Sequence, residues 1–210
     1  MLEWTAYVKI FTTLLAIVNP LGAIPIFISM TGSMASGDRK RVINTASMTV
    51  VVILTVAALL GKPLLDFFGI SIASFKVGGG ILLLLMAISM MQAKYAQTKQ
   101  TPEEEAEAEE KGSIAVVPIA MPLLAGPGAI STIIIYADAS PHVLHLTLLI
   151  ISSALVAALT WVSLSIASPL RSVMSKTSIN IATRLMGLLL AAIAVEFITG
   201  GLTVLLPGLR

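Results

Sequence analysis

Long apolar runs separated by short polar segments account for most of the chain. A helix needs about 20 mostly apolar residues to cross a bilayer, and six runs reach that length. They cover residues 5–30, 43–65, 74–92, 113–136, 143–167 and 183–206. The pattern therefore predicts an all-α integral membrane protein with six transmembrane helices. Spans and short connections take up nearly all of residues 1–210, so we expect a single membrane domain without a separate soluble part.

Proline and glycine interrupt two of these runs, at residues 19–25 and at residues 122–132. Proline removes a backbone amide donor, and glycine permits conformations that other residues avoid. In hydrocarbon, freed backbone groups are tolerated only where they are buried in protein or line a watery cavity. The interruptions therefore predict that the first and fourth spans are broken helices beside such a cavity. The alternative is that the prolines only kink two packed helices.

The two interruptions occupy corresponding places in related halves of the chain. Residues 22–24 and 128–130 share the sequence Gly-Ala-Ile, and Lys76 and Arg184 open the third and sixth spans in similar surroundings. Each half has three spans, an odd number, so the second half must enter the membrane from the opposite side. The halves are therefore predicted to be inverted repeats. Repeat 1 covers about residues 1–95, an acidic cytoplasmic linker about 96–112, and repeat 2 about 113–210.

Lysine and arginine predict the orientation, because cytoplasmic loops are enriched in them. Nine of the thirteen basic residues follow the first, third and fifth spans. We therefore expect these loops in the cytoplasm and both termini outside. The overall composition agrees with a membrane protein, since 11% of the residues are charged, against roughly a quarter in soluble proteins. The run of glutamates at residues 101–111 is interpreted as a solvated linker.

A broken span also predicts a binding site for a zwitterion. Half-helix ends expose amides with partial positive charge and carbonyls with partial negative charge, which can hold a carboxylate and an ammonium group. Asn19 is the first choice among side chains because it both donates and accepts, whereas Thr132 is explained equally well by hydrogen bonding between helices. A small pocket walled by Ala23 and Ala129 is expected to exclude large side chains. The candidate substrate-binding residues are Asn19, Pro20, Gly22, Ala23, Pro25, Gly126, Pro127, Gly128, Ala129, Ser131 and Thr132.

Glu196 is the only acidic residue inside a predicted span. Because a charge in a bilayer is costly, it is a candidate for carrying a coupling proton or for contacting a substrate amine. It follows Arg184 by about 13 residues, or roughly 20 Å of helix, so a position near the outer interface is the alternative. His142 and His145 are interpreted as interfacial residues. Gly78, Gly79 and Gly80 are expected to let a neighbouring helix approach closely.

Several classes of protein are excluded by what the sequence lacks. The absence of cysteine excludes a thiol redox carrier, a c-type haem site and thiolate metal sites. No glycine-rich phosphate loop followed by lysine and serine or threonine is present, so no nucleotide is implied, and nothing indicates nucleic-acid binding. We expect no enzyme, since intramembrane proteolysis would need a serine with a histidine base inside the membrane. We expect no metal or cofactor beyond coupling H⁺ or Na⁺.

Four segments together resemble the MarC family of bacterial and archaeal inner-membrane proteins. They are residues 19–31, 68–81, 117–131 and 184–198, and the resemblance extends over essentially the whole chain. It implies a six-span protein of the neutral amino acid transporter type, grouped with the LysE-like exporters, in the cell inner membrane. For some members of the family it implies transport of glycine and alanine.

From pattern and resemblance we expect a secondary transporter of small neutral amino acids such as glycine or alanine. It would act as an exporter or exchanger, by alternating access between inverted repeats around a fixed site. Its partners would be a small zwitterionic substrate and the lipid bilayer, and a homo-oligomer is compatible with the pattern. The alternatives are an exporter of drugs or other small metabolites, a channel, or a non-transporting membrane subunit.

Overall fold

All regular secondary structure in the described part of this computed structural model is helical, as the sequence predicts. The structure describes residues 3–31, 34–92, 124–167 and 176–209. The helices are α1 (Trp4–Val18), α2 (Pro20–Thr31), α3 (Ser36–Phe67), α4 (Ile72–Met91), α6 (Pro127–Asp138), α7 (Val143–Ser165) and α9 (Lys176–Leu205), followed by a short 3-10 turn, η2 (Pro207–Leu209).

Five helical stretches in the described residues are long and apolar enough to cross a membrane. They are Trp4–Ile24, Ser36–Phe67, Ile72–Met91, Val143–Ser165 and Thr183–Leu205. Each corresponds to a predicted span, and the first is broken between α1 and α2, as expected. Of the predicted fourth span, only the second half is described, as α6; Pro122 and the first half of that span lie outside the described residues.

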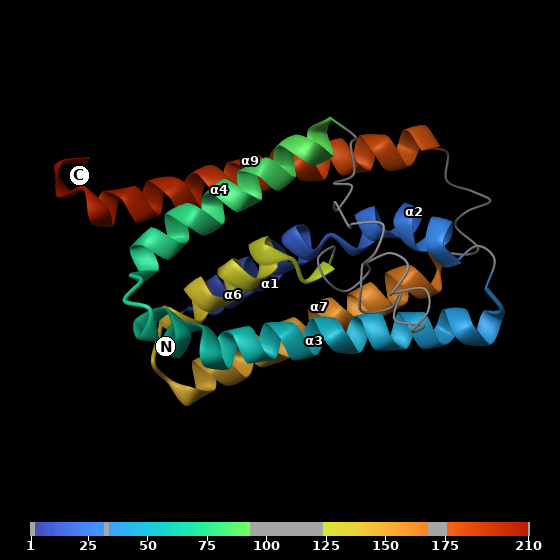
Figure 1. The fold of residues 1–210 in the computed structure, drawn as a ribbon, viewed down its shortest axis with the longest axis horizontal. Coiled ribbons are helices and arrows are strands. Elements are labelled where there is room, and N and C mark those ends of the chain that lie inside the picture. Colours follow the sequence, from blue (N-terminus) through green and yellow to red (C-terminus); the bar gives the residue numbers. More distant parts are fainter. Residues whose placement is uncertain (1–2, 32–33, 93–123, 168–175, 210) are drawn as a thin grey trace.

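The helices form two antiparallel pairs with α1 and α6 between them (Figure 1). The most extensive helix interface joins α4 to α9, and the next joins α3 to α7. Across the second interface, the Trp161 indole N–H donates to the Asn44 side-chain oxygen at 2.7 Å. Both α1 and α6 contact members of each pair. The two central helices thus connect the pairs and bring the interrupted segments to the middle of the molecule.

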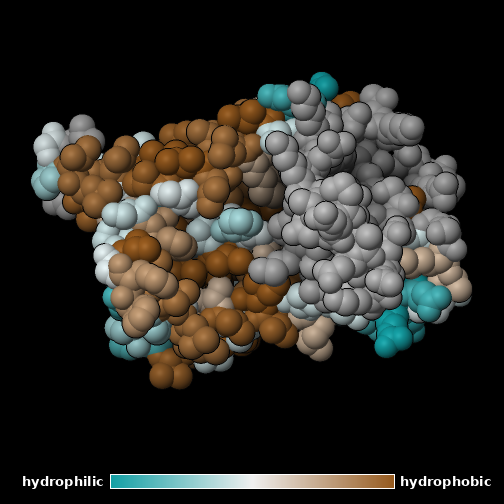
Figure 2. Space-filling view, viewed as in Figure 1, coloured by the Kyte–Doolittle hydropathy of each residue, from teal (hydrophilic) through white to brown (hydrophobic). Residues whose placement is uncertain are grey.

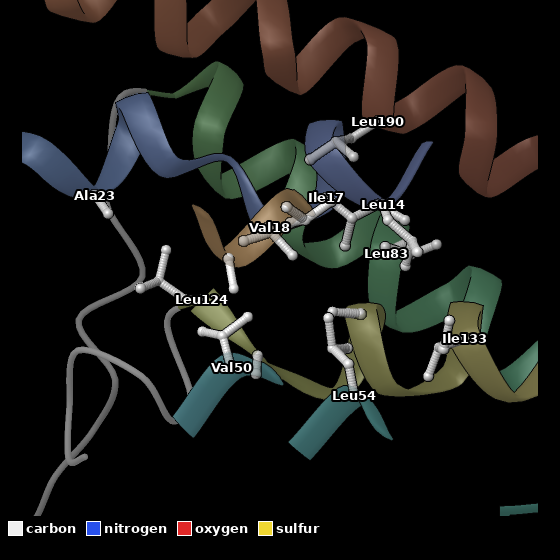
Figure 3. Close-up of a cluster of buried hydrophobic side chains, with 14 of the residues drawn as sticks. Leu14, Ile17, Val18, Ala23, Val50, Leu54, Leu83, Leu124, Ile133 and Leu190 are labelled. Carbon is white, nitrogen blue, oxygen red and sulfur yellow. The ribbon is translucent and has the colours of Figure 1, made fainter. Parts of the chain in front are cut away.

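A continuous apolar core fills the space between the two pairs. Figure 3 shows side chains from α1, α3, α4, α6 and α9 converging there. Fully or almost fully buried members are Leu14, Ile17, Val50, Leu54, Leu83, Leu124, Ile133 and Leu190. Burying a side chain of this kind against others contributes about 1.5–3 kcal/mol in water, but in lipid the gain comes from close packing instead.

The outer surface of the helices is largely apolar. Brown, apolar atoms cover most of the described face in Figure 2, and exposed side chains on α4 and α9 include Leu82, Leu85, Leu185 and Leu188. A helix that is apolar all round is typical of a protein in a membrane, where lipid covers the outward face.

Glycines set the spacing of the α4–α9 pair. A methyl group added at Gly80 would lie 2.7 Å from the Ile198 side chain and 2.9 Å from the Ala194 carbonyl oxygen. At the other end, one added at Gly187 would lie 2.9 Å from the Ala87 carbonyl oxygen. The backbones therefore approach too closely for any side chain, which is the usual role of small residues between membrane helices. The predicted close approach at residues 78–80 is found at Gly80.

Replacing Gly80 by alanine is expected to destabilise the protein by about 1–3 kcal/mol, because α9 would have to move away. Gly78→Ala is the matched control, since nothing lies within 4 Å of a methyl group there. That control should be neutral or stabilising by up to about 1 kcal/mol, because alanine favours helix over glycine. Denaturant unfolding in detergent measures both. Equal effects of the two substitutions would contradict the close approach.

Candidate functional site

One asparagine both ends α1 and starts α2. Asn19 has a left-handed backbone conformation, with φ 44° and ψ 62°. Its N–H donates to the Leu15 carbonyl at 2.9 Å, and its side-chain oxygen accepts the Gly22 N–H at 3.2 Å. Pro20 follows at the first position of α2, where a helix needs no amide donor. Asparagine suits this place because it tolerates the left-handed region and is among the best residues for capping a helix N-terminus.

A cavity of about 630 Å³ lies beside this break. It is bounded by α1 and the start of α2 on one side, and by α7 and α9 on the other. The lining residues are Thr12, Thr13, Leu15, Ala16, Asn19, Pro20, Leu21, Leu159, Ser163, Met186, Leu189 and Ile193. The volume falls within the range of about 300–1,000 Å³ that is typical of small-molecule sites.

Two polar groups on the cavity wall are free to bind a ligand. Within the described part of the chain, neither the Asn19 side-chain NH₂ nor the Ser163 hydroxyl has a hydrogen-bond partner. Both residues are only 9% exposed, and they reach the cavity from α1 and α7 respectively. Thr12 differs, because its hydroxyl donates to the Val8 and Lys9 carbonyls of its own helix. The cavity therefore offers two uncommitted polar groups in a largely apolar wall.

The second interruption packs next to the first but does not line this cavity. Gly126 caps α6, and Pro127 takes the first position of the helix. A methyl group added at Gly128 would lie 2.6 Å from Leu83 and 3.5 Å from Ile17, near the end of α1. The hydroxyls of Ser131 and Thr132 both donate to the Gly128 carbonyl, at 3.1 and 2.8 Å. Gly128, Ser131 and Thr132 are thus part of the core, and the two hydroxyls are already used.

Among the candidate residues whose side chains are described, only Asn19 and Pro20 line the cavity. Gly22, Ala23, Gly128, Ala129, Ser131 and Thr132 are buried in the core, Gly126 is half-buried and Pro127 is exposed. The side chain of Pro25 lies outside what the structure describes. Ala23 and Ala129 do not line this cavity, and each is at most 2% exposed, so a small pocket walled by these two residues stays a prediction.

Sequence reasoning missed most of the cavity wall. One signal was available, since Thr12 precedes Asn19 by two helical turns and therefore shares its face of the first span. No comparable signal distinguishes Ser163, Leu159, Met186 or Ile193 from other residues of two long apolar helices. Their place on the wall depends on how α7 and α9 pack, which a single sequence does not show.

Glu196 forms an ion pair that the sequence analysis did not consider. Its carboxylate lies 2.8 Å from the Lys9 ammonium, and both side chains are 62% exposed. The pair joins α9 to α1, one helical turn from the cavity residues Ile193 and Thr12. Glu196 itself does not line the cavity. In this conformation the Glu196 carboxylate is therefore paired with the Lys9 ammonium. It is not placed to contact a ligand in the cavity.

His145, interpreted as an interfacial residue, lies in the first turn of α7 and is fully buried within the protein. Its Nδ1 lies 3.0 Å from the Tyr7 hydroxyl, and its Nε2 lies 2.8 Å from the Tyr136 carbonyl oxygen. A carbonyl can only accept, so Nε2 carries the hydrogen and Nδ1 accepts from Tyr7. The ring thus connects the start of α7 to α1 and α6, whereas His142 is exposed.

Apolar helices of spanning length, an apolar outer surface and a cavity at a helix break define a multi-pass integral membrane protein of the helical class. The chain belongs to the MarC family of integral membrane proteins, whose family model matches residues 4–206.

Similar proteins occur in bacteria and archaea. The chain is 42% identical to the UPF0056 membrane protein YhcE of Escherichia coli over 99% of this chain and 96% of the relative. It is 35% identical to a UPF0056 membrane protein of Pyrococcus horikoshii, over 93% and 94%. It is 36% identical to one of Methanocaldococcus jannaschii, over 93% and 95%. No solved structure matches the chain.

Asn19→Ala is expected to lower the free energy of unfolding by about 2 kcal/mol, because alanine loses the cap and is disfavoured in the left-handed region. Asn19→Gly should cost only a few tenths of a kcal/mol, since glycine adopts this backbone freely and caps moderately well. Thermal or denaturant unfolding in detergent compares the two. If glycine were as harmful as alanine, the left-handed conformation could not be the reason for asparagine here.

A double-mutant cycle on Lys9→Met and Glu196→Gln is expected to give a coupling energy of at most about 1 kcal/mol, because both side chains are largely exposed. The cycle is measured by unfolding in detergent at low and high salt. A coupling energy well above this value, insensitive to salt, would mean that lipid, and not water, covers the exposed surface of the pair.

Proposed function

We propose that this chain is a secondary transporter of neutral amino acids, acting as an exporter or exchanger, and that the cavity beside Asn19 binds the substrate. The observation that carries the proposal is the cavity itself: it adjoins a broken membrane helix and presents uncommitted polar groups from Asn19 and Ser163. Broken helices at the substrate site are a recurring feature of secondary transporters. Glycine and alanine, the substrates that the resemblance implies, belong to this class.

The chemistry of the wall favours a ligand without net charge. None of the described residues that line the cavity is charged. A ligand with net charge would therefore be desolvated without a counterion, which is costly in an apolar environment. A zwitterion carries its own counter-charge. Its carboxylate can accept from the Asn19 amide, and its ammonium can donate to the Ser163 hydroxyl oxygen and to carbonyls at the C-terminal end of α1.

Helix packing supports the inverted-repeat architecture with six spans. The helices that the repeats would make equivalent are α2 and α6, α3 and α7, and α4 and α9, and the last two pairs are in extensive contact. Such contacts are expected if a twofold axis passes between the halves. They also interlock the repeats, so we propose that the α4–α9 pair moves against the α3–α7 pair, instead of one whole repeat rocking against the other. The cavity lies between α7 and α9 and would open and close with this motion.

We place the protein in the cell inner membrane with both termini outside. Arg39, Lys40 and Arg41 lie in the first turns of the 32-residue helix α3, at the end opposite the α3–α4 connection. Basic residues concentrate on the cytoplasmic side, which makes the α2–α3 connection cytoplasmic. H⁺ or Na⁺ is the proposed coupling ion. No enzymatic activity is proposed, and a homo-oligomer would be accommodated by the apolar outer surface.

An exporter of drugs or other small metabolites is the second candidate, because most of the cavity wall is apolar. Its lining, among the residues that the structure describes, contains no aromatic side chain and so no stacking surface for planar drugs. The transport assay below separates the two candidates directly.

Purified protein in liposomes is expected to exchange labelled alanine for internal alanine, with saturation and counterflow. Ser163→Ala should raise the KM about fivefold, because one hydrogen bond to the substrate is lost. The matched control is Ser152→Ala in the same helix, since Ser152 is similarly buried but donates to the Leu148 carbonyl away from the cavity. Absence of flux for every neutral amino acid, under both proton and sodium gradients, would overturn the proposal. Flux without saturation would indicate a channel.

A further inference from the structure

The far wall of the cavity is apolar and continuous. Met186, Leu189 and Ile193 recur at helical spacing, so they form one face of α9, and Leu159 of α7 extends it. The polar group of Asn19 belongs to the α1–α2 break, and that of Ser163 belongs to α7. A ligand whose charged groups bind Asn19 and Ser163 would therefore direct the rest of the molecule toward this apolar wall.

The cavity is also much larger than the smallest amino acids require. One water molecule accounts for about 30 Å³ of liquid, whereas the cavity has about 630 Å³. With glycine or alanine bound, most of the apolar wall would remain in contact with water or with empty space. A longer apolar side chain would cover that wall, and each buried methylene strengthens binding about fourfold.

The described residues of the wall do not restrict the size of a side chain. The small residues expected to do so, Ala23 and Ala129, lie in the core. Of the lining residues, Met186 has an unbranched and adaptable side chain, which accommodates ligands of different shape. Ala16 is the smallest lining residue, and it leaves space on the α1 side.

We propose that the site binds neutral amino acids with long apolar side chains, of the size of leucine, methionine or norleucine, more tightly than glycine or alanine. This inference rests on the proposed transport function and specifies the substrate for the same cavity. The carboxylate and ammonium groups bind at Asn19 and Ser163, and the side chain lies against Leu159, Met186, Leu189 and Ile193. Met186, Leu189 and Ile193 are then the residues that determine specificity.

A straight-chain series tests the inference in liposomes: alanine, 2-aminobutyrate, norvaline and norleucine compete against a labelled neutral amino acid that the wild type transports. The inhibition constant should fall about fourfold per added methylene along the series. A constant that stays flat or rises with chain length would overturn the inference while leaving transport intact. If no neutral amino acid is transported, the proposed function fails instead.

Filling the cavity provides the structural control. Ala16→Leu narrows the space on the α1 side, so norleucine should lose at least tenfold in affinity while alanine changes less than threefold. Ala192→Leu adds the same side chain to an exposed position of α9 away from the cavity and should change neither. Equal loss for alanine and norleucine in Ala16→Leu would argue against side-chain binding in this space. If Ala16→Leu does not fold, the wild-type series alone decides.

Discussion

Backbone hydrogen bonding inside the bilayer is the constraint on which the site depends. A membrane helix can stop in the hydrocarbon region only if its free amide and carbonyl groups find partners within the protein or in a cavity. Asn19 meets much of this requirement by itself, because its backbone closes the last turn of α1 and its side chain caps the first turn of α2. Residues on both sides of the break, among them Ala16, Pro20 and Leu21, line the cavity. The same interruption that would otherwise be costly thus creates the polar end of an apolar space.

The second interruption meets the same constraint differently. The first turn of α6 is covered by Ile17 and Leu83, and the hydroxyls of Ser131 and Thr132 bond to a carbonyl of their own helix. Breaks that look alike in sequence therefore have unequal roles in this conformation: one borders the cavity and the other lies in the core. Such inequality is compatible with symmetric halves, because alternating access requires the two halves to differ in any one state.

The sequence predicted the features that depend on local composition. It did not predict the contacts and burial that depend on tertiary packing. Hydropathy gave the helical class and the ends of most spans within a few residues, and proline and glycine gave the break at Asn19. Close packing was predicted at residues 78–80, because small residues let membrane helices approach each other, and it is found at Gly80. The partner of Glu196 and the burial of His145 were missed, because both depend on residues more than a hundred positions away. The cavity wall on α9 was missed for the same reason.

The glycine contacts between α4 and α9 also bear on how the protein is made. During synthesis α4 is complete at Met91, whereas α9 begins only at Lys176. At the usual rate of translation, several seconds pass before α9 emerges. Throughout that time the Gly80 face of α4 lacks its final partner and is available to lipid or to other helices. The pair with the most extensive interface is thus the last to form, and the chain is committed to its final arrangement only when its C-terminal helix enters the membrane.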